Sequence, residues 1–450
     1  MNINNDNSRG KESGQKIIIG IDDHDSPVAG CTTHFSTLLI KELIKEKIKL
    51  LDFPYLVRLN PNIPWKTRGN ASIKIIIYSE RDIDELADII WNKSIEYTEK
   101  ISKSAKYNRK PGLAISNKDI SDRWFYEKAV KDVIPLNLAI EYAKKQGMII
   151  KGDRGIIGSI AAISYKPKEF TYELITYRPE NEWNKNKREI DINSVIEFEN
   201  KYFPYVFENI DYIKKYLLIS PHGTDPILYG IRGIDANILL KGLNEIITND
   251  KIDMAMIFKT NQATDDHINS FSNYFYQTTE IEGEISKIDN IRGGDVIINV
   301  NSSTIIVYKE TGELNIASKL LKVGDTIRVV GAVKPSVKYG KIIEAEKIEV
   351  IKLNNKIFKN PECPKCNGST ESLGKGKGFR CKKCGYRFIG EKKLKEIPRE
   401  LTLGIYQSRY YRHLSKPIYL NLIKENNLNI DIINNIIKYL VNFKNMYTYS

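Results

Sequence analysis

Three carboxylates follow an apolar stretch near the start of the chain. Residues 17–21 are β-branched and apolar apart from one glycine, and this run predicts a strand buried on both faces. Asp22, Asp23 and Asp25 come at its end. Carboxylates placed in this way can hold Mg²⁺ together with the phosphates of a nucleotide. The segment therefore predicts a metal–phosphate site, with an ordinary acidic turn as the alternative.

The start of a helix comes next. The apolar spacing of residues 35–48 predicts a helix, and Thr32 and Thr33 stand at its beginning. The first backbone N–H groups of a helix have no partner within it, so they favour a phosphate. We expect Thr33 to lie at such a phosphate. Thr32 is placed either to cap the helix or to receive a phosphoryl group.

A basic loop lies between two predicted strands, residues 55–59 and 73–78. It carries Lys66 and Arg68 among proline and glycine. Positive charge on a loop with glycine freedom suits contacts to phosphate. The alternative is an ordinary basic surface loop.

Two later loops combine aspartate with histidine behind apolar runs. Asp225 lies in the loop over 220–233, and Asp265 and Asp266 lie in the loop over 259–267. Polar residues on loops after buried strands are candidates for a binding site. The histidines in these loops, taken alone, more often only form hydrogen bonds.

The cysteines indicate a metal. Two CxxC pairs are separated by fourteen residues, and together they supply Cys363, Cys366, Cys381 and Cys384. Four thiolates complete a tetrahedral Zn²⁺ site that leaves no position open, so the metal is expected to be structural. This use of cysteine also favours a reducing cytoplasm over a disulfide-forming compartment.

Length and charge limit the possible classes. The 450 residues are enough for several domains, and the net charge of +13 with a pI near 9.1 favours a polyanionic partner, RNA or DNA. No run of eighteen apolar residues occurs, so no membrane partner is expected. Residues 1–15 are polar and predict a disordered tail. The chain contains neither a GxGxxG sequence nor a Walker A sequence in the required context, so a Rossmann or P-loop assignment is not supported.

Hydrophobic periodicity divides the chain into regions. Strands and helices alternate up to about residue 275, with helical regions over 82–101 and 119–146, which is typical of an α/β (α+β) fold. A change in pattern then predicts five short strands, with a short helix over 317–321 before the fourth. They cover 282–289, 295–300, 304–308, 325–333 and 342–350. This favours an OB-fold barrel, with an SH3-like barrel as the alternative. The end of the chain is basic, and 418–443 is predicted helical.

Five motifs carry a resemblance to a known family. They read GIDDHDSPVAGCTT, RLNPNIPWKTRGNAS, KGDRGIIGSIAAI, SPHGTDPILYGIRG and KTNQATDDH, in that order. In this order they resemble the archaeal tRNA(Ile) 2-agmatinylcytidine synthetases, and the resemblance covers nearly the whole chain. It implies an ATP-dependent ligase that modifies the wobble cytidine of the isoleucine tRNA with a CAU anticodon. In that chemistry ATP phosphorylates the cytosine C2 carbonyl oxygen, and agmatine then displaces the phosphate.

The resemblance also implies an architecture. It consists of a disordered tail over 1–15, a kinase-like catalytic domain over 16–165 and a ferredoxin-like domain over 166–275 whose boundary can interleave with the first. An OB-fold over 276–355, a zinc ribbon over 356–390 and a basic, helical C-terminal segment over 391–450 follow. The barrel and the ribbon would grip the tRNA.

Residue roles follow from the same resemblance. Asp22, Asp23 and Asp25 match the acidic cluster expected to bind Mg²⁺ and ATP. Thr32 matches the threonine that family members autophosphorylate, and Lys66 and Arg68 lie in the matching basic loop.

The agmatine pocket is left open by the sequence. Agmatine is a dication whose pocket needs carboxylates or aromatic faces, and Asp225, Asp265 and Asp266 are the candidate carboxylates. His24 departs from the family, which typically has threonine there. We expect it to contact metal or phosphate, or to face solvent.

The competing hypothesis is a non-catalytic protein that binds RNA or single-stranded DNA through the barrel and ribbon. The array of Asp22, Asp23, Asp25 and Thr32 argues against it, because anionic RNA disfavours clustered acids.

Overall fold

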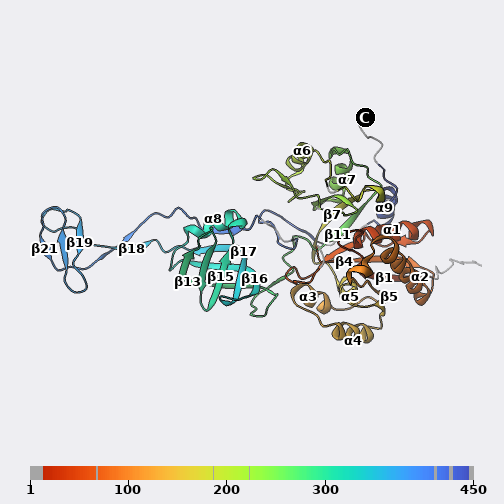
Figure 1. Cartoon of the computed structure of the whole chain (residues 1–450), viewed down its shortest axis with the longest axis horizontal. Helices are drawn as coiled ribbons and strands as arrows, with labels where there is room; N and C mark the ends of the chain where they lie inside the picture. The colour runs from red at the N-terminus through yellow and green to blue at the C-terminus, as the bar shows by residue number, and fades with distance from the viewer. Residues whose placement is uncertain are drawn as a thin grey trace, which may run out of the picture. The chain divides into compact units, whose positions relative to one another are not determined.

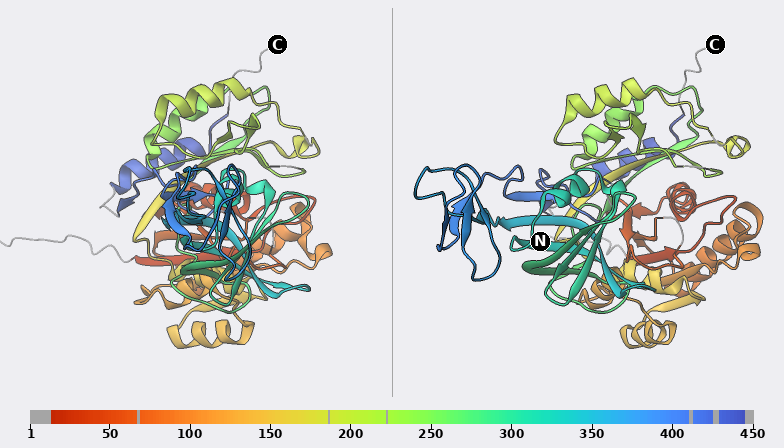
Figure 2. Two further views of the ribbon diagram at one scale, coloured as in Figure 1. Left: turned by 90° about the vertical axis from the view of Figure 1, so that its left-hand side faces the viewer. Right: turned by 60° about the vertical axis from the view of Figure 1, so that its left-hand side comes forward.

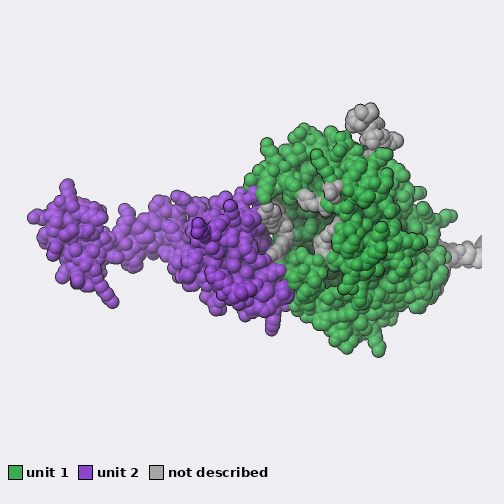
Figure 3. Space-filling view, in the orientation of Figure 1, with its two compact units in different colours: residues 1–268, 412–450 green, residues 269–411 purple. Residues whose placement is uncertain are grey.

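The chain folds into two compact units (Figures 1 and 3). The computed structural model describes residues 14–66, 69–185, 187–221, 223–409, 413–424 and 429–444. The first unit consists of residues 1–268 and 412–450, and the second of residues 269–411. Each unit has its own apolar core, and these cores share no residue.

One mixed sheet organises the first unit. Its order is β10-β7-β11-β3-β4-β1-β5-β6, with β2 beside β4 and β24 beside β7. The pairs are antiparallel except β11 with β3. The strands are β1 (Gln15–Asp22), β2 (Lys49–Leu50), β3 (Tyr55–Arg58), β4 (Ala71–Ser79), β5 (Gly112–Ser116), β6 (Ile149–Gly152), β7 (Glu169–Tyr177), β10 (Ile227–Gly233), β11 (Met254–Thr260) and β24 (Ile423–Lys424). A separate hairpin pairs β8 (Ile210–Asp211) with β9 (Tyr216–Leu217).

Strand β1 is buried on both faces, as its sequence predicts. Ile17, Ile19 and Ile21 enter the core cluster that includes α1, whereas Ile18 enters the cluster on the other face, which includes α5. The sheet continues without a break past residue 165, where the sequence places a domain boundary.

Helices cover both faces of this sheet (Figures 1 and 2). They are α1 (Thr32–Lys45), α2 (Ile83–Glu96), α3 (Trp124–Lys131), α4 (Leu136–Gln146), α5 (Ile156–Ser164), α6 (Ile192–Tyr202), α7 (Ala236–Glu245) and α9 (Ile430–Leu440). A π-helical turn, Tyr97–Ile101, extends α2, and short 3-10 turns cover Ser104–Tyr107 and Glu180–Glu182. None of the helices in the described part of the chain is long and apolar enough to cross a membrane.

The structure corrects two sequence predictions and contains one strand that was not predicted. The helical region over 119–146 is two helices, because Pro135 removes a backbone donor and precedes α4. The helix predicted over 418–443 is confirmed only for α9, which has the amphipathic spacing, and the same range also contains the short strand β24. Strand β5 was not predicted from the sequence, although all of its residues are buried.

The second unit contains a closed five-stranded barrel. Its strands are β13 (Thr278–Asn290), β14 (Val296–Val300), β15 (Ser303–Val307), β16 (Thr326–Ser336) and β17 (Gly340–Lys352). Closure follows because β13 pairs with both β14 and β16, while β15 pairs with β17. The helix α8 (Glu313–Leu320) precedes the fourth strand, near the predicted position. A 3-10 turn, Lys309–Thr311, leads into α8, and β23 (Gly404–Gln407) pairs with β17.

The cysteine region of the second unit is built from short strands. They are β18 (Lys356–Lys359), β19 (Thr370–Ser372), β20 (Phe379–Cys381), β21 (Arg387–Phe388) and β22 (Lys393–Glu396). The pairs β19–β20 and β20–β21 form one small sheet, and β18–β22 forms another. A further short strand, β12 (Ile268–Asn269), pairs with β13.

Candidate active site

The loop between β1 and α1 orients the predicted phosphate acceptor. Cys31, and not Thr32, is the N-cap of α1, since its sulfur accepts a hydrogen bond from the backbone N–H of His34. Thr32 is the first helical residue, and its Oγ1 accepts the backbone N–H of His24 at 3.2 Å. Thr32 and Thr33 are both buried, and both line a cavity.

This cavity has a volume of about 290 Å³ and lies wholly within the first unit. It is lined by segments far apart in sequence: Asp25, Cys31, Thr32, Thr33, Leu56, Arg58, Gly69, Asn70, Ala71, Glu173, Ile175, Leu218, Ile219, Ser220, Pro221, Asp225, Ile227, Gly230, Arg232 and His413. Their convergence follows from the sheet, in which β3, β11, β7 and β10 are successive strands. The wall therefore combines apolar side chains with charges of both signs.

Two buried aspartates supply negative charge to the cavity. Asp25 is 8% exposed and Asp225 is 3% exposed. The Asp225 carboxylate accepts the backbone N–H of Ile227 at 2.8 Å. Burial, with the nearby charge of Asp225, raises the pKa of the Cys31 thiol above its ordinary value. The sulfur is therefore protonated and is not poised as a nucleophile.

A buried carboxylate between two guanidinium groups forms another part of the wall. Glu173 lies 3.3 Å from Arg58 and 3.8 Å from Arg232, measured between the nearest charged atoms. The Gln262 side chain also donates to Glu173, at 2.5 Å, and its amide oxygen lies 3.0 Å from Nδ1 of His413. Arg232 also lies 3.9 Å from the buried carboxyl group of Glu208, so the two guanidinium groups are held among buried acidic groups.

The electrostatics of His413 agree with this description. Burial lowers its pKa well below the ordinary value, and the positive charges of Arg58, Arg232 and Lys66 add to the effect. His413 is therefore neutral near pH 7. Lys66 is exposed and is not part of the cavity wall, although its charge acts on that side. Arg68, the other basic residue predicted to contact phosphate from this loop, lies outside the described residues.

Asp22 and Asp23 lie beside the start of α5. Oδ1 of Asp22 accepts the backbone N–H of Asp23 at 2.8 Å, and Oδ2 of Asp23 accepts that of Lys110 at 2.9 Å. Helix α5 approaches so closely that a Cβ added at Gly158 would lie 1.8 Å from Oδ2 of Asp22. Burial raises the pKa of both carboxyl groups, and for Asp22 the charges of Asp23 and Asp25 add to it. The charged forms of this pair are therefore disfavoured in the absence of a cation, and a bound cation would stabilise them.

The three acids do not form one closed metal cage. Among the described residues, the four cysteines make up the only set of three or more candidate ligands whose atoms lie within 4.8 Å of one another. Asp25 lines the cavity, whereas Asp22 accepts the backbone N–H of Asp23, and Asp23 accepts that of Lys110. An Mg²⁺ ion that keeps several waters and binds substrate phosphates needs only one or two carboxylates, so the pair Asp22 and Asp23 fits such an ion.

Other predicted site residues have different surroundings. His24 does not face solvent. It is fully buried, stacks on Phe35 with ring centroids 4.2 Å apart and lies 2.6 Å from the Ser94 hydroxyl. Its ring thus anchors the acidic loop to α1 and α2.

The remaining predicted agmatine ligands are absent from the lining of the cavity. The Asp266 carboxylate accepts the Tyr126 hydroxyl at 2.6 Å and pairs with Arg123 at 3.4 Å. The Asp265 carboxylate accepts the backbone N–H of Lys416 at 2.7 Å. These two acids hold loops together, and Asp225 alone of the three candidates lines the cavity.

Sequence reasoning missed Glu173 as a candidate site residue, and it noted Arg232 only as the arginine of the segment over 220–233, without assigning it a role. Both lie on strands, where single charged residues read as ordinary solvent-facing positions. A charged residue in the middle of β7, directly before Leu174 and Ile175, was the signal that could have indicated Glu173.

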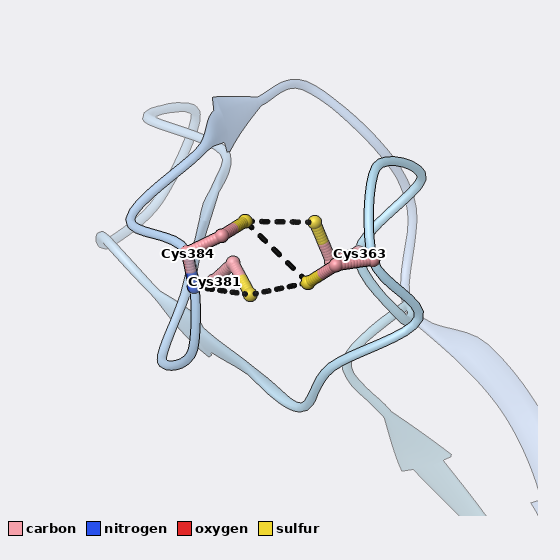
Figure 4. Close-up of side chains that lie close together, drawn as sticks. Cys363, Cys381 and Cys384 are labelled. Atoms are coloured by element: carbon pink, nitrogen blue, oxygen red, sulfur yellow. Dashed lines mark hydrogen bonds between the residues drawn. The ribbon is translucent and has the colours of Figure 1, made fainter.

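The four cysteines of the second unit converge as predicted (Figure 4). Sulfur–sulfur distances are 3.6 Å for Cys363–Cys384, 3.5 Å for Cys366–Cys381 and 3.4 Å for Cys366–Cys384. The pKa of the Cys381 thiol is lowered, first by the backbone N–H of Cys384. Such spacing fits thiolates around one tetrahedral Zn²⁺.

Three family models match this chain in order. They are described as the TiaS TCKD domain, over residues 18–154, the TiaS FLD domain, over 153–267, and the TiaS C-terminal zinc ribbon domain, over 360–401. The isoleucine-tRNA 2-agmatinylcytidine synthetase TiaS of Saccharolobus islandicus is 51% identical over 421 residues, which cover 92% of this chain and 94% of the relative. The protein of the same name from Methanocaldococcus jannaschii is 39% identical, covering 90% and 98%.

Solved structures show the same similarity. A complex of TiaS with isoleucine tRNA and ATP superposes with a TM-score of 0.80 at 31% identity, covering 92% of this chain and 99% of that one. A complex of TiaS with isoleucine tRNA, AMPCPP and agmatine has a TM-score of 0.77 at 29% identity, with the same coverage.

Proposed function

Since the chain belongs to the TiaS family of tRNA(Ile) 2-agmatinylcytidine synthetases, we propose that it joins agmatine to the wobble cytidine of the CAU-anticodon isoleucine tRNA with consumption of ATP. The observation that carries this proposal for the chain's own residues is the cavity beside Thr32. It combines a helix start, two buried aspartates and apolar walls. A protein that only bound RNA would not need such a cavity, and nothing observed favours that alternative.

Agmatine would occupy this cavity. Its two cationic ends match buried carboxylates, for which we propose Asp225 and Asp25. Its aliphatic chain matches the apolar wall, to which Ile175 and Ile219 contribute. We do not assign this role to Asp265 or Asp266, since their carboxylates bond to neighbouring loops.

ATP would bind on the side of Asp22 and Asp23. These carboxylates would hold Mg²⁺ with the phosphates, and Mg²⁺ would supply neutralisation of the charge on the transferring group. The positive charges of Arg109 and Arg154 act to lower the pKa of Asp23, and we propose that both arginines contact the same phosphates. We assign Thr33 and the loop of Lys66 and Arg68 to phosphate contacts as well.

The reaction needs two bond exchanges at the cytosine. The C2 carbonyl oxygen bonds to the γ-phosphorus of ATP while the bond from that phosphorus to the bridging oxygen breaks and ADP leaves, which converts the C2 oxygen into part of a leaving group. The amine of agmatine loses a proton, bonds to C2, and the C2–O bond then breaks with release of phosphate. Asp25 is positioned to accept that proton, while Thr32 lies in the same wall as an acceptor for phosphoryl transfer.

The finer architecture belongs to the same proposal. Residues 16–165 would form a kinase-like domain and 166–275 a ferredoxin-like domain within the one sheet. Residues 276–355 would form an OB-fold, 356–390 a ribbon that holds structural Zn²⁺, and 391–450 a basic C-terminal segment. We infer that the protein acts in the cytoplasm, where tRNA is found and thiols stay reduced.

The test is incorporation of radiolabelled agmatine into unfractionated archaeal tRNA with ATP and Mg²⁺. Label should enter only the isoleucine tRNA with a CAU anticodon. Asp225→Asn keeps the oxygen that accepts the Ile227 N–H but removes the charge, so the KM for agmatine should rise about tenfold or more while the KM for ATP stays unchanged.

Asp250→Asn is the matched control for this test. Asp250 is another buried aspartate that accepts a backbone N–H, that of Glu189 at 2.7 Å, and it does not line the cavity. Equal changes in both KM values for Asp225→Asn would contradict its assignment. Absence of incorporation by the wild type would contradict the proposed function itself.

A further inference from the structure

The loop that directly precedes β13, the first strand of the barrel, exposes large aromatic rings. Phe271 is 75% exposed and Tyr274 is 74% exposed, and Phe275 next to them is 44% exposed. The first two are the most exposed aromatic side chains of the described residues. Exposing such rings to water costs free energy, so a gathered set of them indicates a binding surface.

This loop, residues 270–277, is held firmly in place. The backbone N–H of Ser272 donates to Thr279 at 2.8 Å, and that of Tyr276 donates to the Val333 carbonyl at 2.8 Å. Nζ of Lys341 donates to the carbonyl and side-chain oxygens of Asn273, at 2.6 and 3.0 Å. The rings are therefore presented by a fixed backbone.

Lysines alternate with aromatic rings across this surface. Lys341 lies 5.1 Å from the centre of the Phe275 ring, and Lys334 lies 5.6 Å from that of Tyr276. At the hairpin between β16 and β17, Lys338 lies 5.0 Å from the Tyr339 ring. The two hollows beside the loop share Phe271, Asn273 and Lys341 in their walls.

Flat rings with adjacent positive charges suit one kind of partner. Unpaired nucleotides offer bases that stack on aromatic faces and phosphates that attract lysine. A base-paired stem keeps its bases stacked inside the helix, so it could use the lysines but not the rings. Glu280 and Glu282, which line one of these hollows, both lie against Arg328, at 4.0 and 2.7 Å, and this arginine offsets part of their charge.

We propose that residues 270–277, with Lys334, Lys338 and Lys341, form a stacking surface for unpaired nucleotides of the tRNA substrate. The identity of that RNA rests on the proposed function. The surface belongs to the second unit, whereas the cavity belongs to the first, so the chemistry at C2 does not require the rings.

The test compares binding of three RNAs by the full chain and by the double variant Phe271→Ser/Tyr274→Ser. The RNAs are the CAU-anticodon isoleucine tRNA, a single-stranded pyrimidine 12-mer and a blunt duplex of similar charge. Each lost stack should weaken binding about tenfold, so the variant should bind the tRNA and the 12-mer roughly a hundredfold more weakly. Duplex binding and the kcat at saturating tRNA should be unchanged.

Ile316→Ser is the control, because Ile316 is an apolar residue on α8 of the same barrel with 63% exposure. It should leave all three affinities unchanged. Unaltered affinity of the double variant for tRNA, or an equal loss on the duplex, would overturn the proposal. Either result would leave agmatine incorporation by the wild type, and hence the proposed function, untouched.

Discussion

At the scale of the residue, His24 shows how the acidic loop is stabilised. Its ring is buried against Phe35 and Ser94, while its backbone N–H holds the Thr32 hydroxyl. Burial lowers the pKa of this imidazole to about 3. The ring is therefore neutral in the folded protein throughout the range in which an unfolded histidine titrates.

This burial has a consequence for stability. Below about pH 6.5 the imidazole of His24 binds a proton in the unfolded chain but not in the folded chain. The free energy of unfolding therefore falls as the pH drops from there toward 3. For His24 the loss between pH 7.5 and pH 5.0 should be about 2 kcal/mol. His24→Asn removes the group and should reduce the pH dependence of unfolding by that amount.

Urea unfolding followed by tryptophan fluorescence measures this effect in the first unit. All four tryptophans of the chain, at positions 65, 91, 124 and 183, belong to that unit. His34, whose pKa burial also lowers to about 3, keeps its own contribution in the variant. A variant with the full pH dependence of the wild type would contradict the assignment to His24.

At the scale of the element, helix α5 fixes the position of Asp22. Gly158 lets the helix lie directly against that carboxylate, and Ser159 donates to the Gly112 carbonyl on β5 at 2.8 Å. In Gly158→Ala the new methyl group would force the carboxylate aside. We expect incorporation of agmatine to fall at least tenfold, with unfolding of the first unit easier by about 1–3 kcal/mol.

Gly242→Ala separates these two effects. Gly242 lies in α7, and an added Cβ would lie 2.3 Å from a side-chain carbon of Ile231, away from the acids. This control should lose stability in the same way but keep its activity. If Gly158→Ala lost stability alone, α5 would have no role in holding the acid.

Local pattern was sufficient to predict some elements of the fold. The strand before Asp22, the helix after it and the five barrel strands each follow from a run of neighbouring residues. The helix predicted over 418–443 is confirmed only for α9, because Ile423 lies instead in the two-residue strand β24, which pairs with β7 through a long-range contact. The spacing of apolar residues along the chain does not indicate which distant strands pair with one another.

The site was predictable in part for the same reason. The cysteines, and the residues from Asp22 to Thr33, lie close together in the sequence, so their spacing alone predicted that they form sites. The wall with Glu173 and Arg232 depends on the order of β3, β11, β7 and β10, which the sequence does not state. His24 reads as a polar loop residue, and only its packing against Phe35 gives it a structural role.

At the scale of the whole molecule, two separate cores predict separate responses to loss of metal. The cysteine region exposes most of its short strands and has few buried apolar residues, chiefly Phe379. Structural Zn²⁺ in such a region contributes folding free energy directly, so removal should unfold it. The first unit holds none of these cysteines and has its own apolar clusters.

Treatment with a strong chelator should therefore release one zinc ion per chain and make residues 356–396 sensitive to protease. The tryptophan fluorescence of the first unit should not change, because all of its tryptophans lie outside the affected region. Cys381→Ser should reproduce the chelated state without chelator, whereas Cys31→Ser, which alters the cysteine at the start of α1, should keep its zinc. A colorimetric assay measures the zinc content, and proteolysis followed by mass spectrometry shows whether residues 356–396 are cleaved. A chain without zinc that resists protease would show that the ribbon folds on its own packing, and a shift in tryptophan fluorescence would show that the metal also stabilises the first unit.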